Sequence, residues 1–172
     1  MRAIIRRKKP PEIRIIFLAD IENLLLNLPP MGPGMFSLST GFDRVMKEIA
    51  RTVGPIEDLL AFLPPHLIPI HGEELHRLGF TIIACPKVRA KGTGREVDIT
   101  DEILIERGKK EIRRMQGITH LCLGSGDKDF SLLVREAIHR GLKIIVVASS
   151  RNSLSKELID LSDQVFLFSP AE

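Results

Sequence analysis

Residues 13–23, Ile-Arg-Ile-Ile-Phe-Leu-Ala-Asp-Ile-Glu-Asn, carry the strongest signal for the fold. The first seven of them form a β-rich apolar run between Pro10-Pro11 and Asp20, which is typical of a buried strand. Residues 21–28 can form a short helix, which must end before Pro29-Pro30. The sequence therefore predicts a first strand that ends at a carboxylate and passes directly into a helix.

The rest of the chain alternates β-rich runs with amphipathic segments. Further strands are expected at 56–62, 80–85, 118–123, 142–148 and 164–168, and further helices at 42–53, 72–78, 97–115, 130–140 and 153–161. Loops are expected at 29–34, around Pro64-Pro65 and Pro69, and at 87–95, while Gly79 should cap the C-terminus of the helix at 72–78. This alternation predicts an α/β fold in which right-handed crossovers place helices on both faces of a mostly parallel sheet.

Composition narrows the class of protein. The chain has 172 residues, 44% of them hydrophobic, which suits one domain with a real core. Eight Phe with no Trp or Tyr argue against binding a single strand through many stacked bases. The net charge of +3 and the pI near 9.0 are compatible with a polyanionic partner without being diagnostic.

The sequence predicts no association with a membrane. No run approaches the roughly 20 apolar residues that span a bilayer. Asp20 and Glu22 interrupt the apolar run that follows the basic N-terminus, which argues against a signal peptide. We therefore expect a soluble, cytoplasmic protein. A homodimer is compatible with the sequence, which does not fix the number of chains.

Cysteine and histidine give no metal or catalytic signal. Cys85 and Cys122 lie in apolar runs, are read as small buried strand residues, and lack the spacing of a zinc site. A reduced pair is the default and a disulfide remains open. The histidines have no spacing that suggests a catalytic pair, so surface or core positions are expected for all of them: His66, His71, His76, His120 and His139.

Carboxylates follow two of the predicted strands. Asp20 comes directly after the first strand, and Asp127 and Asp129 come just past the strand at 118–123, in Gly-Ser-Gly-Asp-Lys-Asp-Phe. An open α/β sheet binds its ligands beyond the C-terminal ends of its strands, near a topological switch point. These acids are therefore expected to gather in one place.

A third segment adds acids at the start of the predicted long helix. Asp98 begins that helix, Asp101 lies one turn on, and Glu102 is beside it. Carboxylates packed without a cation repel one another, whereas oxygen ligands suit the hard cations Mg²⁺ and Mn²⁺. A cation bound there would lower the pKa of water and stabilise charge on a phosphate. The pattern favours a shared metal site.

Each acid alone has a structural alternative. Asp98 or Asp101 could be a helix-start carboxylate favoured by the macrodipole. Asp127 and Asp129 could be turn and N-cap residues, and Asp20 could be a cap between strand and helix. These capping and helix-dipole roles do not explain why three separate segments place acids at the same sheet edge.

Three motifs, in this order, resemble those of NYN domains, which belong to the PIN-like ribonucleases. They are Asp20 followed three residues later by Asn23, the basic loop that runs into Val97-Asp98, and Asp127-Lys128-Asp129-Phe130 after a Ser-Gly turn. The match covers roughly residues 13–168, so we read 1–12 as a basic N-terminal arm and 169–172 as a C-terminal tail. The resemblance implies a PIN-like three-layer fold and an Mg²⁺- or Mn²⁺-dependent nuclease acting on RNA.

By motif position, the resemblance implies an acidic site of Asp20, Asp98, Asp127 and Asp129, with Asn23 holding Asp20 or a water on the metal. Two positions depart from the family. The family often has another acid about two turns into the long helix, where this chain has Leu104, and Asp101 or Glu102 could substitute. Lys128 stands where a small polar residue is more common, and it could reach a phosphate or partly neutralise the acids.

Basic residues suggest how a polyanion would be held. The expected substrate contacts are Asn23, Lys91, Arg95, Ser125 and Lys128. The 87–95 loop places its cations immediately before Asp98, which favours a role in binding phosphates. The basic arm at 1–12 is equally compatible with RNA contact and with a solvated tail. The cations at 109–114 are read as a solvated helix face.

The leading hypothesis is metal-dependent hydrolysis of an RNA phosphodiester that leaves a 5′-phosphate. The alternative is a non-catalytic RNA-binding or scaffold domain that keeps the PIN-like fold, which Leu104 and Lys128 make credible. A weaker third hypothesis is a receiver- or phosphatase-like domain, since Glu22 follows Asp20 at the spacing such enzymes use. Asn23 fits the nuclease pattern better.

Overall fold

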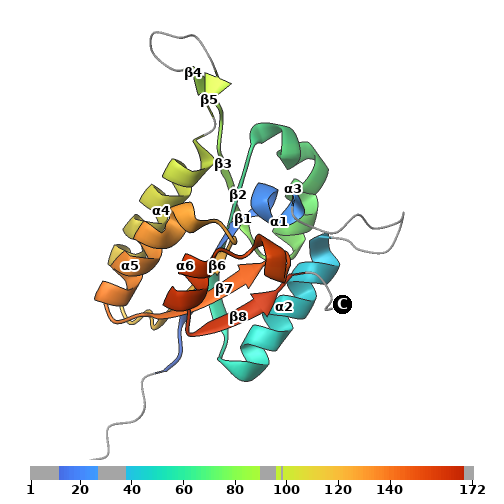
Figure 1. Cartoon of the computed structure of the whole chain (residues 1–172). Helices are drawn as coiled ribbons and strands as arrows, with labels where there is room; N and C mark the ends of the chain where they lie inside the picture. Colours follow the sequence, from blue (N-terminus) through green and yellow to red (C-terminus); the bar gives the residue numbers. More distant parts are fainter. Residues whose placement is uncertain (1–11, 27–37, 90–95, 98, 169–172) are drawn as a thin grey trace, which may run out of the picture.

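One six-stranded sheet separates two layers of helices in the computed structural model, which describes residues 12–26, 38–89, 96–97 and 99–168 (Figure 1). The strands are β1 (Ile15–Asp20), β2 (Ile56–Leu63), β3 (Thr81–Ala84), β6 (His120–Gly124), β7 (Lys143–Ala148) and β8 (Gln164–Leu167). They lie in the order β3-β2-β1-β6-β7-β8, and every neighbouring pair is parallel. The predicted three-layer α/β fold is confirmed.

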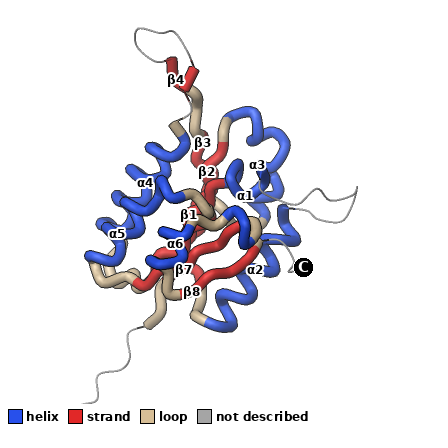
Figure 2. Tube along the Cα trace, viewed as in Figure 1, coloured by secondary structure: helices blue, strands red, loops and turns tan. Residues whose placement is uncertain are grey.

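Helices cover both faces of the sheet (Figure 2). The helices α1 (Ile21–Leu26), α2 (Leu38–Thr52) and α3 (Ile68–Arg77) pack on one face. The helices α4 (Thr100–Arg114), α5 (Ser131–His139) and α6 (Lys156–Leu161) pack on the other. Each layer contributes its own core, so the sheet is buried on both sides.

Strand β1 lies in the middle of the molecule, and its residues alternate between the two cores. Ile15, Phe17 and Ala19 belong to the core under α1–α3, whereas Ile16 and Leu18 belong to the core under α4–α6. All five are fully buried. Neither face of such a buried parallel strand contacts solvent, which explains the continuous apolar run in the sequence.

The strand order creates a switch point between β1 and β6. From β1 the chain adds β2 and then β3 outward on one side, and it later returns to add β6, β7 and β8 on the other. The segments that follow β1 and β6 therefore leave the sheet in opposite directions. A crevice is expected where they diverge, at the C-terminal ends of these two strands.

Two of the predicted helices begin earlier than expected. Helix α2 starts at Leu38, four residues before Phe42, and α3 starts at Ile68 after a 3₁₀ turn, η1 (Pro65–Leu67). The prediction of a loop through Pro65 and Pro69 was wrong. Each proline lies in the first turn of a helix, where the missing N–H has no carbonyl partner to lose.

The segment before α4 also differs from the prediction. Val88 pairs with Val97 in a short antiparallel ribbon, β4 (Val88–Arg89) and β5 (Glu96–Val97), which stands off the body of the domain (Figure 1). The expected plain loop at 87–95 was wrong at Val88–Arg89, with residues 90–95 outside the described residues, and the expected helix start at Val97 was wrong as well. Helix α4 begins at Thr100, beyond Asp98, and Asp98 itself lies outside the described residues.

Three smaller predictions can be compared with the structure. Gly79 has a φ of +92° and ends α3 as expected, because glycine tolerates this left-handed conformation. Cys85 and Cys122 are buried and free, which leaves no disulfide between them. The predicted last helix at 153–161 is a 3₁₀ turn, η3 (Arg151–Ser153), followed by α6. No helix in the described part of the chain is long and apolar enough to span a bilayer.

Candidate metal centre

A cavity of about 200 Å³ lies at the C-terminal ends of the central strands, where the switch point predicts a crevice. We call it the acidic cavity; it is lined by Asp20, Glu22, Asn23, Leu26, Thr100, Asp101 and Asp127. None of the described residues that line it is basic. The electrostatic potential inside it therefore favours a cation.

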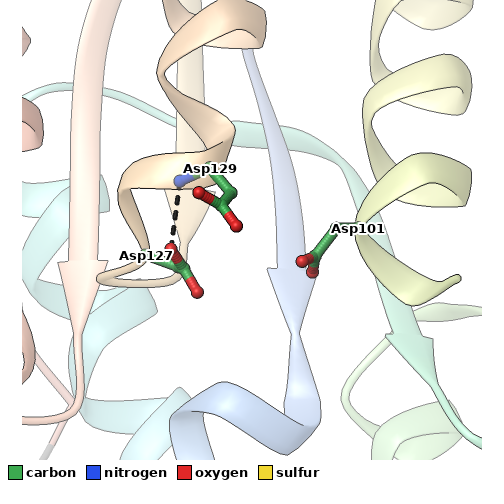
Figure 3. A group of neighbouring side chains, drawn as sticks. All are labelled: Asp101, Asp127 and Asp129. Atoms are coloured by element: carbon green, nitrogen blue, oxygen red, sulfur yellow. Dashed lines mark hydrogen bonds between the residues drawn. The ribbon is translucent and has the colours of Figure 1, made fainter. Parts of the chain in front are cut away.

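Three aspartates from two elements lie close together, and two of them line this cavity (Figure 3). Asp101 comes from the first turn of α4, and Asp127 and Asp129 come from the turn after β6. One carboxylate oxygen of each lies within 4.8 Å of the other two. Oxygens that share one cation at about 2.0–2.6 Å lie at most about 4–5 Å apart, so this acidic cluster has the spacing and donor type of a hard-cation site.

The turn after β6 presents its two aspartates through a local hydrogen-bond pattern. The Ser125 hydroxyl accepts from the Asp127 N–H at 3.3 Å, and Asp127 Oδ1 accepts from the Asp129 N–H at 3.0 Å. Asp127 thereby caps the 3₁₀ turn η2 (Lys128–Phe130), which leads directly into α5. The second oxygen of Asp127 remains available toward the cluster (Figure 3).

Gly126 fixes this turn against the neighbouring loop. Its carbonyl accepts from the Ser155 N–H at 2.9 Å, and a Cβ at position 126 would overlap the carbonyl group of Ser153. Only glycine allows this close approach of two backbones. The loop after β7 therefore supports the turn that carries Asp127 and Asp129.

Asn23 connects the two segments that diverge at the switch point. Its side-chain Oδ1 accepts from the Gly126 N–H at 3.2 Å, and its own N–H donates to Asp20 Oδ1 at 3.2 Å. The Ser149 hydroxyl donates to the Asn23 carbonyl at 3.2 Å. The backbone N–H of Asn23 thus contacts the acid that Asn23 was expected to hold.

Asp20 is the most buried acid of the cavity, with 5% of its surface exposed. Burial raises the pKa of its carboxyl from 3.8 to about 7, the Asn23 N–H opposes this rise, and the nearby charges of Asp101, Glu22 and Asp127 add to it. A carboxyl held among like charges without a cation favours its protonated form. A divalent cation would reverse that preference.

The other residues predicted from the sequence fall into different places. Ser125 is fully buried, and its hydroxyl accepts a hydrogen bond within the turn; its expected contact with a substrate stays a prediction. Leu104 is fully buried in the core under α4–α6 and is not a site position. Lys128 is exposed. Asp98, Lys91 and Arg95 lie outside the described residues.

Sequence reasoning missed three residues that line the cavity: Glu22, Leu26 and Thr100. Glu22 and Leu26 stand four residues apart on α1, a spacing that places both on one helix face and could have identified them. Leu26 is 75% exposed, so the rim of the cavity includes an apolar side chain.

Comparisons with known proteins agree with this architecture. The family model described as NYN domain matches residues 14–169. VPA0982, a protein of unknown function from Vibrio parahaemolyticus, has a similar crystal structure: the TM-score is 0.70 and the identity 21%, over 95% of this chain and 97% of that chain. That likeness shows the fold alone.

A second solved structure is more distant. MurG from Acinetobacter baumannii has a TM-score of 0.47 and 13% identity, over 89% of this chain and 40% of that chain, and it carries no argument. No curated protein matches the chain. Because the family model spans nearly all of the sequence, the chain belongs to the NYN domain family.

Proposed function

We propose that this NYN domain is a ribonuclease that hydrolyses RNA phosphodiester bonds with the help of Mg²⁺ or Mn²⁺. The observation that carries the proposal is the acidic cluster, in which three carboxylate oxygens lie within 4.8 Å of one another at the switch point of the sheet. NYN domains are PIN-like nucleases, so the family supports the same reaction class.

Each residue of the site has a role that its position suggests. Asp101, Asp127 and Asp129 would hold the cation, and Asp20 would complete the negative charge at the base of the cavity. Asn23 keeps Asp20 and the 124–127 turn in register through its two hydrogen bonds. A divalent cation bound there would supply a Lewis acid and lower the pKa of water for attack on phosphorus. Asp101 would contribute from the first turn of α4, and the family resemblance implies the same role for Asp98, which lies outside the described residues.

The alternative is an RNA-binding domain without catalysis, motivated by Leu104 and Lys128. It rested on Leu104 at an expected acidic position, and Leu104 packs in the core one turn away from Asp101. Its other motivation, Lys128, is an exposed residue and does not line the cavity. Turnover, which binding alone cannot produce, separates the two functions.

The test is cleavage of labelled RNA with single-stranded and structured regions by the purified chain in Mg²⁺ or Mn²⁺. We expect cleavage that stops with excess chelator and returns when the metal is restored, leaving 5′-phosphate ends. An Asp101→Asn sample purified by the same steps controls for contaminating nucleases. Tight RNA binding without turnover under either metal would favour the non-catalytic alternative.

Replacing Gly126 by alanine should disturb the turn that carries Asp127 and Asp129. The new Cβ would overlap the Ser153 backbone, which cannot move cheaply, so we expect a loss of about 1–3 kcal/mol in the free energy of unfolding. The affinity for Mn²⁺ should fall as well, because Asp127 and Asp129 come directly after Gly126 in the chain. Denaturant unfolding and calorimetric Mn²⁺ titration measure the two effects.

Gly141→Ala is the control for that prediction. Gly141 has a φ of +82° and open space around its Cβ position, so the substitution should cost about 1 kcal/mol through backbone strain alone. It should leave Mn²⁺ affinity unchanged. Wild-type Mn²⁺ affinity in Gly126→Ala would contradict the role given to the close packing at Gly126.

A further inference from the structure

Nine of the eighteen lysines and arginines that the structure describes form an ion pair with a neighbouring carboxylate. Ion pairs of 4.0 Å or less engage Arg14, Lys47, Arg77, Arg107, Arg113, Arg114, Arg135, Arg140 and Lys143. Lys128, Arg151 and Lys156 are exposed and form no ion pair with any described residue. We call these three the cationic rim.

The three cations are carried by segments that pack together beside the acidic cavity. Lys128 lies between Asp127 and Asp129 in η2, Arg151 begins η3 after β7, and Lys156 begins α6. Gly126 links these segments, since the Ser153 backbone packs against it and the Ser155 N–H donates to its carbonyl at 2.9 Å. All three positions are therefore at the C-terminal ends of β6 and β7.

The acid beside Lys156 in the chain has another partner. Glu157 follows Lys156, but its carboxylate pairs with Arg135 at 3.0 Å. Hydrogen bonds from Arg135 and Ser131 lower the pKa of Glu157 first, with the charges of Arg135 and Lys128 adding a smaller part. Lys128 thus lies near the first turn of α6, and none of the three rim cations forms an ion pair with a described carboxylate.

We propose that the cationic rim binds backbone phosphates of the RNA strand on the β7 side of the acidic cavity. This inference rests on the proposed function and adds Arg151 and Lys156, which the sequence did not suggest. A polyanion is repelled by the carboxylates of the cavity, so flanking phosphates need cations that no protein acid has neutralised. Exposed charges act over about 8 Å at physiological salt, which suits cations next to the site rather than across the molecule.

The test compares two triple variants with the same change in net charge. Lys128→Ala/Arg151→Ala/Lys156→Ala removes the rim, and Arg51→Ala/Lys109→Ala/Lys110→Ala removes cations at the end of α2 and on α4 that also lack a described ion pair. Binding of a short fluorescein-labelled single-stranded RNA is measured in chelator at about 50–200 mM salt. Thermal melts verify that each variant is folded.

We expect the rim variant to bind about 10-fold or more weakly, with the slope of log affinity against log salt reduced by about 2, since each lost phosphate contact removes about 0.7. The control variant should bind within about 2-fold of wild type. Equal weakening in both variants would overturn the proposal, because it would show that only net charge matters. A charge-keeping variant, Lys128→Arg/Arg151→Lys/Lys156→Arg, should retain binding.

Cleavage kinetics then test whether the cationic rim contributes to substrate binding during the reaction. Loss of the rim should raise KM about 10-fold and leave kcat within about 3-fold, because the rim holds the strand without touching the acidic cluster. Binding is measured in chelator, so its outcome does not depend on turnover. Absence of cleavage in wild type would therefore reject the proposed function alone, whereas wild-type binding by the rim variant would reject the rim alone.

Discussion

Changing Asp101 to asparagine is expected to lower the rate of metal-dependent RNA cleavage by about 100-fold or more. Asp101 supplies one of the three carboxylates of the acidic cluster and is the only one that comes from α4. Asparagine keeps the shape of the side chain and removes its charge, so a change in activity reports the loss of a ligand. Mn²⁺ affinity, measured by calorimetry, should fall as well.

Glu102→Gln is the matched control for this prediction. Glu102 is the next residue in the same helical turn, but its side chain lines a groove on the outer face of α4 instead of the acidic cavity. We expect its cleavage rate and Mn²⁺ affinity to stay within about 2-fold of wild type. Equal losses in the two variants would point to disruption of the helix N-terminus, and full activity in Asp101→Asn would remove Asp101 from the site.

Asp98→Asn provides a direct comparison between sequence and structure. The family motif assigned the helix-start acid to Asp98, which lies outside the described residues, and the described part of the chain brings Asp101 into the cluster. The two positions are three residues apart, and the pattern Val97-Asp98-Ile99 is compatible with a helix that begins at Val97. Activity measurements on both variants would show how the two acids share the role.

Helix α4 begins later than expected because of a contact between residues distant in the sequence. Val97 pairs with Val88 across the β4–β5 ribbon, and this pairing holds residue 97 in a strand. Local propensity cannot reveal a partner nine residues away, so sequence reasoning extended the helix too far. Asp101 then occupies the first turn of α4, where the helix dipole favours an acid.

Strand β1 and its acid were predictable because their signals are local. A buried central strand requires an unbroken apolar run, and such a run ends at the first polar residue, Asp20. The aspartates after β6 were predictable in the same way, since they lie in a short turn between a buried strand and a helix. Location at the sheet edge then follows from the parallel topology.

The contacts that hold the site together were not predictable, because they join residues far apart in the sequence. Asn23 bonds the Gly126 N–H across 103 positions of sequence, and Gly126 packs on the Ser153 backbone of a third segment. Nothing near these residues in the sequence identifies the partner. Both Asn23 and Ser125 were consequently read as substrate contacts, although their hydrogen bonds organise the turn that carries the acids.

Asp20→Asn is expected to stabilise the metal-free protein at neutral and alkaline pH. Burial, together with the charges of Asp101, Glu22 and Asp127, raises the pKa of Asp20 to about 7 against the opposing Asn23 N–H. Below about pH 4 the carboxyl is protonated in the folded and unfolded chains alike, so it adds no pH dependence there. Between about pH 4 and pH 7 only the folded chain retains the proton, and stability falls as the pH rises, by about 1.4 kcal/mol per pH unit.

Asparagine carries no charge at any pH and avoids this loss. At pH 8 without metal, Asp20→Asn should exceed wild type by roughly 2–4 kcal/mol in the free energy of unfolding, or by about 5–12 °C in Tm. The difference should vanish near pH 4. Asp160→Asn, which changes an exposed acid on α6, should shift Tm by less than about 2 °C at either pH.

Metal should remove the difference in stability between the two proteins. A divalent cation that binds the folded chain stabilises it by mass action, and wild type has the charge that the cation requires. Saturating Mn²⁺ at pH 8 should therefore raise the Tm of wild type more than that of Asp20→Asn and close the gap between them. A gap that persists unchanged in Mn²⁺ would mean that the cost of burying Asp20 is unrelated to cation binding, and Asp20 would then be a core acid beside the site.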